Sequence, residues 1–115
     1  MSKNVQEIIA QMVHSNDVVL FMKGTRVFPQ CGFSGTLANI LDQLDIQYRD
    51  INVLDDDVLR QGIKEFSNWP TIPQLYVHGE FIGGCDIVRE MAQAGELQQL
   101  FDKKGIAYDK SKALA

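Results

Sequence analysis

The sequence predicts an α/β protein in which a small mixed four-stranded sheet is flanked by helices. The first half of the chain alternates segments that have apolar residues at helical spacing with short β-rich segments, a pattern typical of a β-α-β unit. In the second half, QLYV at 74–77 and EFIG at 80–83 are separated only by His78 and Gly79, which predicts an antiparallel hairpin. The sheet should therefore contain both parallel and antiparallel strands.

The chain opens with a predicted amphipathic helix that leads into a buried strand. Apolar residues recur at helical spacing over residues 5–13, and Asn4 with Glu7 resembles a capping box. The polar residues at 15–17 end this helix. The next segment, VVLFM at 18–22, is apolar without alternation, so we expect a central strand that is covered on both faces.

A second helix, a second strand and a third helix follow. The helical spacing of apolar residues resumes at Gly32 and continues to Leu44, and IQYRDINV at 46–53 has the composition of a strand. Three aspartates at 55–57 supply negative charge to the first turn of a further helix, which continues to about Phe66.

Two short helices complete the predicted fold. Asp86 is expected to cap a helix that runs to Gly95, and a last helix is stopped by the Lys-Lys-Gly segment at 103–105. Residues 106–115 are expected to form a loose tail. This order of elements is the thioredoxin-type topology. At 115 residues and 45% hydrophobic content, the chain fits one compact domain over residues 1–115.

Composition and charge exclude several classes of function. The net charge is −4, from 11 basic and 15 acidic residues, so we expect neither nucleic acid nor an anionic membrane as a partner. The sequence contains no run of about 18 apolar residues and no apolar signal segment, which predicts a soluble protein that is not exported. Its two cysteines lie far apart, unlike a disulfide scaffold, so we expect a reducing cytoplasm.

Cys31, in the segment FPQCGFS at 28–34, is the candidate reactive residue. A strand-loop-helix transition there would place its sulfur at a helix N-terminus, where free N–H groups and the helix dipole favour the thiolate, a nucleophile and metal ligand. A buried, inert cysteine is the alternative. The preceding Pro29 and the following Gly32 favour an exposed sulfur. Ser34 occupies the place of a second cysteine, so the thiol has no local disulfide partner.

Four segments carry a resemblance to a known family: MKGT at 22–25, CGFS at 31–34, WPTIPQLYV at 69–77 and GGCD at 83–86. In their order and spacing they are similar to monothiol glutaredoxins of the Cys-Gly-Phe-Ser type, and the sequence resembles the bacterial single-domain members of that family. The resemblance covers nearly all of residues 3–104. The chain departs from the family in TRVFP at 25–29, where members often have a second proline directly after the threonine.

The resemblance implies that a glutathione molecule binds beside Cys31. Lys23 follows the first strand, where its ammonium would attract a carboxylate and lower the pKa of the thiol, although a solvated surface lysine is the commoner outcome. Arg60 corresponds to a residue that contacts a glutathione carboxylate in the family, and an exposed ion pair with a neighbouring aspartate is the alternative. The other implied contacts are the backbone of Ile72, before the proline that the family holds in cis, and the helix start at Cys85 and Asp86.

The remaining candidates have plainer interpretations. Cys85 either presents its backbone to glutathione or forms an occasional disulfide with Cys31, and we favour the backbone contact. Trp69 is interpreted as a core residue. His14 and His78 lie at a helix end and in a turn without metal-ligand spacing, so both are expected at the surface.

Two classes of function fit these residues. In a cluster carrier, the thiolates of Cys31 and of one glutathione from each of two protomers would supply the four sulfur ligands of a 2Fe–2S cluster in a homodimer. In an enzyme, Cys31 would attack a glutathione mixed disulfide, which a second glutathione would resolve. The resemblance favours the carrier, because members with this tetrapeptide are generally weak oxidoreductases that pass clusters to apo-proteins and pair with BolA-like proteins. A purely structural adaptor would leave the coincidence of Lys23, Cys31 and GGCD unexplained.

Overall fold

The computed structural model of the chain describes residues 4–111. Within this range, no helix has both the length and the apolar character needed to cross a membrane. The elements, in chain order, are α1 (Val5–Val13), β1 (Val18–Met22), α2 (Gly32–Gln43), β2 (Arg49–Asn52), the 3-10 turn η1 (Val53–Asp55), α3 (Asp57–Ser67), β3 (Gln74–Val77), β4 (Glu80–Gly83), α4 (Cys85–Gln93) and α5 (Glu96–Lys104).

The four strands form one mixed sheet in the order β2-β1-β3-β4. β1 pairs in parallel with β2 and antiparallel with β3, and β3 pairs antiparallel with β4. Every residue of β1 is buried, as expected for an apolar strand at the centre of a covered sheet. In the β3–β4 turn, φ is positive at both His78 (50°) and Gly79 (77°), the conformation that a two-residue hairpin turn requires. The predicted mixed sheet is confirmed.

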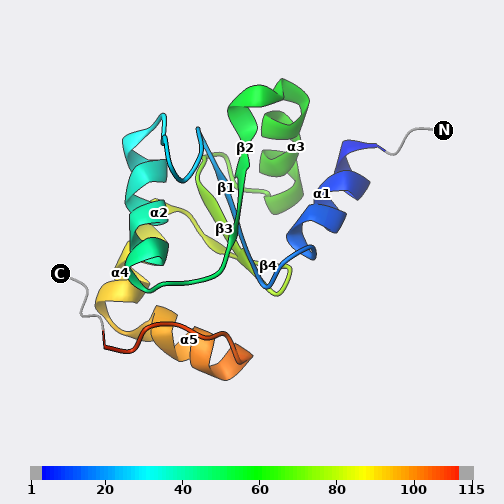
Figure 1. Ribbon diagram of the computed structural model, residues 1–115. Coiled ribbons are helices and arrows are strands. Elements are labelled where there is room, and N and C mark those ends of the chain that lie inside the picture. Colours follow the sequence, from blue (N-terminus) through cyan, green and yellow to red (C-terminus); the bar gives the residue numbers. More distant parts are fainter. Residues whose placement is uncertain (1–3, 112–115) are drawn as a thin grey trace.

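Helices cover both faces of the sheet and give the molecule three layers (Figure 1). α1 and α3 lie on one face, where the core contains Ile9 and Ile63. α2 and α4 lie on the other face, with α5 against α4, and their core contains Leu37 and Val88. The carboxyl ends of the parallel strands β1 and β2 and the N-termini of α2 and α3 are at the same end of the molecule, which is where α/β folds place their binding sites.

Two predicted helix starts are confirmed by their caps. The N–H of Glu7 donates to Asn4 Oδ1 over 3.0 Å at the start of α1. The Asp56 carboxylate accepts the N–H groups of Val58 and Leu59 at 3.0 and 3.1 Å at the start of α3. Each side chain satisfies helix N–H groups that have no partner within the helix.

The second strand is shorter than the predicted segment 46–53. β2 ends at Asn52, because its side-chain oxygen accepts the N–H of Leu54 over 3.0 Å and turns the chain into η1. The same oxygen accepts the N–H of Gly24 over 2.9 Å. Asn52 therefore ends the strand and also holds the start of the loop that leads to Cys31.

The first part of the predicted tail is attached to the domain, which corrects the expectation of a loose segment. Ile106 and Tyr108 are partly buried against the α2–α4–α5 core. The Ile106 N–H donates to Phe101 O and the Asp109 N–H to Leu44 O, each over 2.8 Å. Burial of these two apolar side chains offsets the entropy lost by ordering the segment. Residues 112–115 lie outside the described range.

Candidate functional site

Cys31 is the N-cap residue of α2, with φ −150° and ψ 136°, and is half-buried. A hydrogen bond from the Ser34 N–H contributes most to lowering the pKa of the Cys31 thiol. The Phe33 N–H and the Lys23 ammonium lower this pKa further. Partial burial opposes them. The geometry therefore agrees with the predicted thiolate at a helix N-terminus.

Ser34 has a structural part in this site, although it supplies no second sulfur. Its side chain is fully buried, and its Oγ accepts the backbone N–H of Lys23 over 3.0 Å. A hydrogen bond from the same hydroxyl helps to lower the pKa of Cys31. Ser34 thus connects the end of β1 to the thiol, so that Lys23 and Cys31 are held beside each other.

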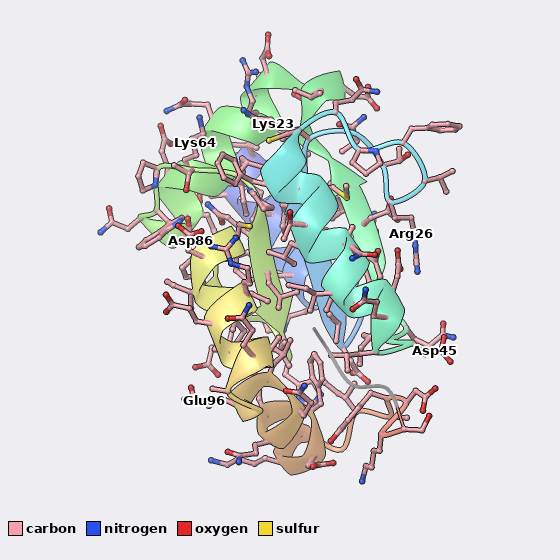
Figure 2. All side chains as sticks on the ribbon, turned by 90° about the vertical axis from the view of Figure 1, so that its left-hand side faces the viewer. Lys23, Arg26, Asp45, Lys64, Asp86 and Glu96 are labelled. Carbon is pink, nitrogen blue, oxygen red and sulfur yellow. The ribbon has the colours of Figure 1, made fainter. Side chains whose placement is uncertain are left out.

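A cavity of about 480 Å³ adjoins Cys31. Of the residues predicted to bind glutathione, all but Arg60 line it. Figure 2 shows Lys23, Lys64 and Asp86 on the same side of the molecule, with Arg26 on the opposite side of α2. The lining residues are Lys23, Cys31, Phe33, Lys64, Trp69, Pro70, Thr71, Ile72, Pro73, Gly84, Cys85, Asp86 and Ile87.

On α3, the cavity is lined by Lys64, which the sequence analysis missed. Arg60 lies one turn earlier, and its Nη2 pairs with Asp57 Oδ1 over 3.0 Å, the alternative considered above. Both cations lie on one face of α3, because residues four apart on a helix are neighbours. The four-residue spacing of Arg60 and Lys64 could have indicated that either cation was able to line the cavity, but it could not show which one does.

Trp69 also lines the cavity, which corrects its interpretation as a plain core residue. Its ring is half-buried and packs against Phe81 at 5.8 Å between centroids. Its Nε1 atom is buried and has no hydrogen-bond partner among the described residues. The position of Trp69 just before the Thr-Ile-Pro segment, which also lines the cavity, could have indicated this placement.

A buried polar network supports the backbone of the segment from Trp69 to Pro73. Gln74 is fully buried, and its Nε2 donates to Trp69 O and Thr71 O over 3.3 and 3.2 Å. The Tyr76 hydroxyl donates to Gln74 Oε1 over 3.0 Å. The Ile72–Pro73 bond is cis, as the resemblance implied. The network satisfies carbonyl groups in a segment without regular structure, so the cavity wall has a defined position.

The start of α4 lines the cavity beside this segment and differs from the prediction in one detail. The N-cap is Gly84, the helix begins at Cys85, and Asp86 lies within the first turn. Asp86 therefore does not cap the helix, and its carboxylate instead pairs with Arg89 over 3.1 Å. A Cβ at position 84 would make a tight contact of 3.3 Å with Pro73 O, so the glycine allows α4 to begin close to Pro73.

Cys85 lines the same cavity as Cys31 but has the opposite acid–base character. Burial is the main cause that raises the pKa of its thiol, and the negative charges of Asp86 and Cys31 act in the same direction. Arg89 opposes them. Both cysteines are free thiols in the structure.

Alkylation should distinguish the two thiols. Because the thiolate is the reactive form, we expect iodoacetamide to modify Cys31 faster than Cys85 near neutral pH. The rate at Cys31 should reach half its maximum at a lower pH than that of an unperturbed thiol, and the rate at Cys85 at a higher pH. Peptide-level mass spectrometry over a pH series measures both rates in one wild-type sample. Identical midpoints would contradict the assignment.

The described part of the chain has no ready-made metal site. Residues 4–111 contain no group of three or more His, Cys, Asp or Glu side chains that could hold a metal ion. His14 and His78 are both exposed, as predicted. Among the described residues, Cys31 is the one cysteine of the cavity whose pKa is lowered, which favours it as a ligand for an outside group.

The chain is similar to known proteins over most of its length. A family model described as Glutaredoxin matches residues 18–82. The chloroplastic monothiol glutaredoxin-S14 of Arabidopsis thaliana is 52% identical over 103 residues, which are 90% of this chain and 60% of that protein. The probable monothiol glutaredoxin 2 of Rickettsia typhi is 54% identical over 99 residues, which are 86% of this chain and 88% of that protein.

Solved structures share the fold. The solution structure of a monomeric truncated mutant of Trypanosoma brucei 1-C-Grx1 has a TM-score of 0.84 at 38% identity, covering 95% of this chain and 99% of that one. The crystal structure of a buckwheat glutaredoxin–glutathione complex has a TM-score of 0.78 at 26% identity, covering 90% and 92%. With the observed strand order, these likenesses confirm the predicted thioredoxin-type fold.

Proposed function

This chain belongs to the glutaredoxin family, among its monothiol members, and on that premise we propose that it carries an iron–sulfur cluster. In this proposal it binds glutathione beside Cys31, holds a 2Fe–2S cluster between two copies of the chain and passes the cluster to apo-proteins. The observation that carries the proposal is the Cys31 thiol, whose pKa is lowered, on the wall of a cavity with cationic and helix-terminal groups.

The cavity suits glutathione in size and charge. Its volume of about 480 Å³ is within the usual range for small-molecule sites. Glutathione carries two carboxylates, which the ammonium groups of Lys23 and Lys64 and the N-terminus of α4 would attract. We propose that Arg60 joins them when it leaves Asp57. The bound glutathione in the buckwheat structural relative supports this assignment.

The backbone around Ile72 and Cys85 would hold the peptide part of glutathione. Ile72 is 6% exposed and lines the cavity with its neighbours. Cys85 and Asp86 occupy the first turn of α4, where backbone N–H groups lack partners within the helix. Because Gln74 holds the carbonyl groups of Trp69 and Thr71, the backbone around Ile72 is positioned before glutathione binds.

A cluster shared between two chains fits the available ligands better than one held by a single chain. Four sulfur ligands are required. Cys31 offers one thiol whose pKa is lowered, whereas burial raises the pKa of the Cys85 thiol and disfavours its thiolate. Two Cys31 thiolates and two glutathione thiolates complete the set, so the cluster-bound form would be a homodimer. Each Cys31 would therefore be a cluster ligand.

The proposal extends to the partners and the compartment. Apo iron–sulfur proteins would receive the cluster, and a BolA-like protein would replace one copy of the chain in a mixed complex. Both assignments follow from membership of the family. A thiolate that must remain reduced suits a reducing compartment, so we propose a cytoplasmic location.

A glutathione-dependent oxidoreductase is the second candidate, favoured by the lowered pKa of the half-buried Cys31 thiol. The Cys31 thiolate would attack the glutathione sulfur of a mixed disulfide, form a disulfide with glutathione and release the substrate as a thiolate. A second glutathione thiolate would attack the glutathione sulfur of that disulfide, restoring Cys31 and producing oxidised glutathione. We propose that this activity is weak at most.

Reconstitution tests the carrier proposal. Under anaerobic conditions, we expect iron, sulfide and glutathione together to give the visible absorption of a 2Fe–2S cluster and a shift from monomer-sized to dimer-sized protein. Omitting glutathione should prevent both changes, because two of the four ligands are missing. Size-exclusion chromatography with iron and glutathione analysis measures the result. A full cluster without any added thiol would contradict the proposal and return attention to the oxidoreductase.

A further inference from the structure

Cys31 follows a loop, residues 23–30, that has little regular structure yet must place the sulfur at the start of α2. The loop closes on itself through Gln30 N–H to Lys23 O over 2.9 Å and Thr25 N–H to Phe28 O over 3.2 Å. Its tip is exposed: Val27 and Phe28 have 72% and 73% of their surface accessible. The loop therefore has no apolar burial at its tip to hold it.

Arg26 connects this loop to two other parts of the fold. Its backbone N–H donates to Asp50 Oδ2 of β2 over 2.9 Å. Its guanidinium donates to Asp42 Oδ1 in α2 over 2.9 Å and to Tyr48 O over 3.3 Å. The guanidinium also lies 4.0 Å from the centre of the Tyr48 ring, close enough for a cation–π contact.

The partners of Arg26 are themselves well placed to hold it. Tyr48 is 7% exposed, and its hydroxyl donates to the same Asp42 Oδ1 over 3.1 Å. Asp42 lies in the last turn of α2, where the helix dipole disfavours a carboxylate, so a cation beside it is stabilising. A planar guanidinium can bond two acceptors and stack on a ring at once, which an ammonium cannot do as well.

We propose that Arg26 is a positioning residue for Cys31, which fixes the loop 23–30 by tying it to the end of α2 and to β2. Arg26 does not line the cavity, and it lies on the opposite side of α2 from Lys64 and Asp86 (Figure 2). It therefore acts through the loop rather than on a ligand. The inference rests on Cys31 as the reactive thiol but on neither glutathione nor a cluster.

The direction in which two substitutions change the alkylation rate of Cys31 distinguishes positioning of the loop from a through-space effect of charge. Arg26→Ala removes a positive charge and Asp42→Ala a negative one. If these charges acted on Cys31 through space, the first would slow its alkylation and the second would accelerate it. If the Arg26–Asp42 pair instead holds the loop in position, both substitutions should slow the alkylation of Cys31. We expect both variants to alkylate Cys31 roughly two- to fivefold more slowly than wild type, in keeping with the modest worth of half-exposed ion pairs.

The experiment measures iodoacetamide rates at Cys31 in the glutathione-free protein, with hydrogen exchange of the loop amides. Exchange over 24–30 should accelerate in both variants. The alkylation rate of Arg26→Lys should fall between those of wild type and Arg26→Ala. If thermal unfolding shows that Arg26→Ala is unfolded, Arg26→Lys takes its place in the comparison. Arg49→Ala is the control, because Arg49 is exposed on β2 and bonds Ser15 over 2.9 Å.

Unchanged rates in both variants, faster alkylation in Asp42→Ala, or an equal loss in Arg49→Ala would each overturn the proposal. Because alkylation requires neither glutathione nor iron, a failure here is distinct from a failed reconstitution. Conversely, a protein that binds no cluster would still show the positioning effect.

Discussion

Replacing Cys31 with serine is expected to abolish cluster binding and leave the fold intact. A serine hydroxyl does not supply a thiolate ligand, and the raised pKa of Cys85, the other cysteine of the chain, disfavours it as a replacement. Cys31 is the half-buried N-cap of α2, and serine is a preferred residue at that position, so the exchange should cost little stability. Iron content, visible absorption and circular dichroism after anaerobic reconstitution measure cluster and fold separately.

Cys85→Ser is the matched control for this prediction. It removes the other thiol of the same cavity, but the pKa of Cys85 is raised and its proposed contact is through the backbone. We expect this variant to retain much of its cluster. A cluster that survives Cys31→Ser, or one lost equally in both variants, would show that the ligands have been misassigned.

Removing both cavity lysines should weaken glutathione binding by about two orders of magnitude or more. Lys23 lines the cavity from the loop just after β1 and Lys64 from α3, and each charge-assisted hydrogen bond contributes on the order of 1.5–3 kcal/mol. Lys23→Ala combined with Lys64→Ala leaves the carboxylates of glutathione without these partners. Calorimetric titration of the apo-protein with glutathione measures the loss, which cluster retention should follow.

The control variant removes two positive charges at a site outside the cavity. Lys103→Ala with Lys104→Ala changes two lysines in the last turn of α5, outside the cavity, and should leave glutathione affinity unchanged. Arg60→Ala should have a smaller effect than the cavity pair, because binding through Arg60 must first break its pair with Asp57. Equal affinity of the Lys23–Lys64 variant and wild type would contradict the proposed site.

Much of the fold could be predicted from residues near one another in the chain. The apolar run of β1, the caps at Asn4 and Asp56 and the two-residue turn at His78 each depend on local conformation. The position of Cys31 at the start of α2 follows from the same kind of signal. The structure contains these features because helix periodicity, capping and turn geometry depend on residues within a few positions of one another.

Contacts between distant residues could not be predicted in this way. Arg60 and Lys64 share one face of α3, so which of them reaches the cavity depends on where α3 lies along its axis relative to the cavity, and one helical turn changes the answer. The packing of Ile106 and Tyr108 depends on a surface built from three helices.

The loop before Cys31 is the clearest case. At position 26 the sequence shows only an arginine where the resembling family often has a proline. A proline restrains a loop through its own ring, which is visible in the sequence. Arg26 restrains it through Asp42, Tyr48 and Asp50, which are 16 or more residues away along the chain. Those partners meet Arg26 only in the folded chain, where β2 lies beside β1 with Asp50 opposite Leu20 and the loop runs back along β2.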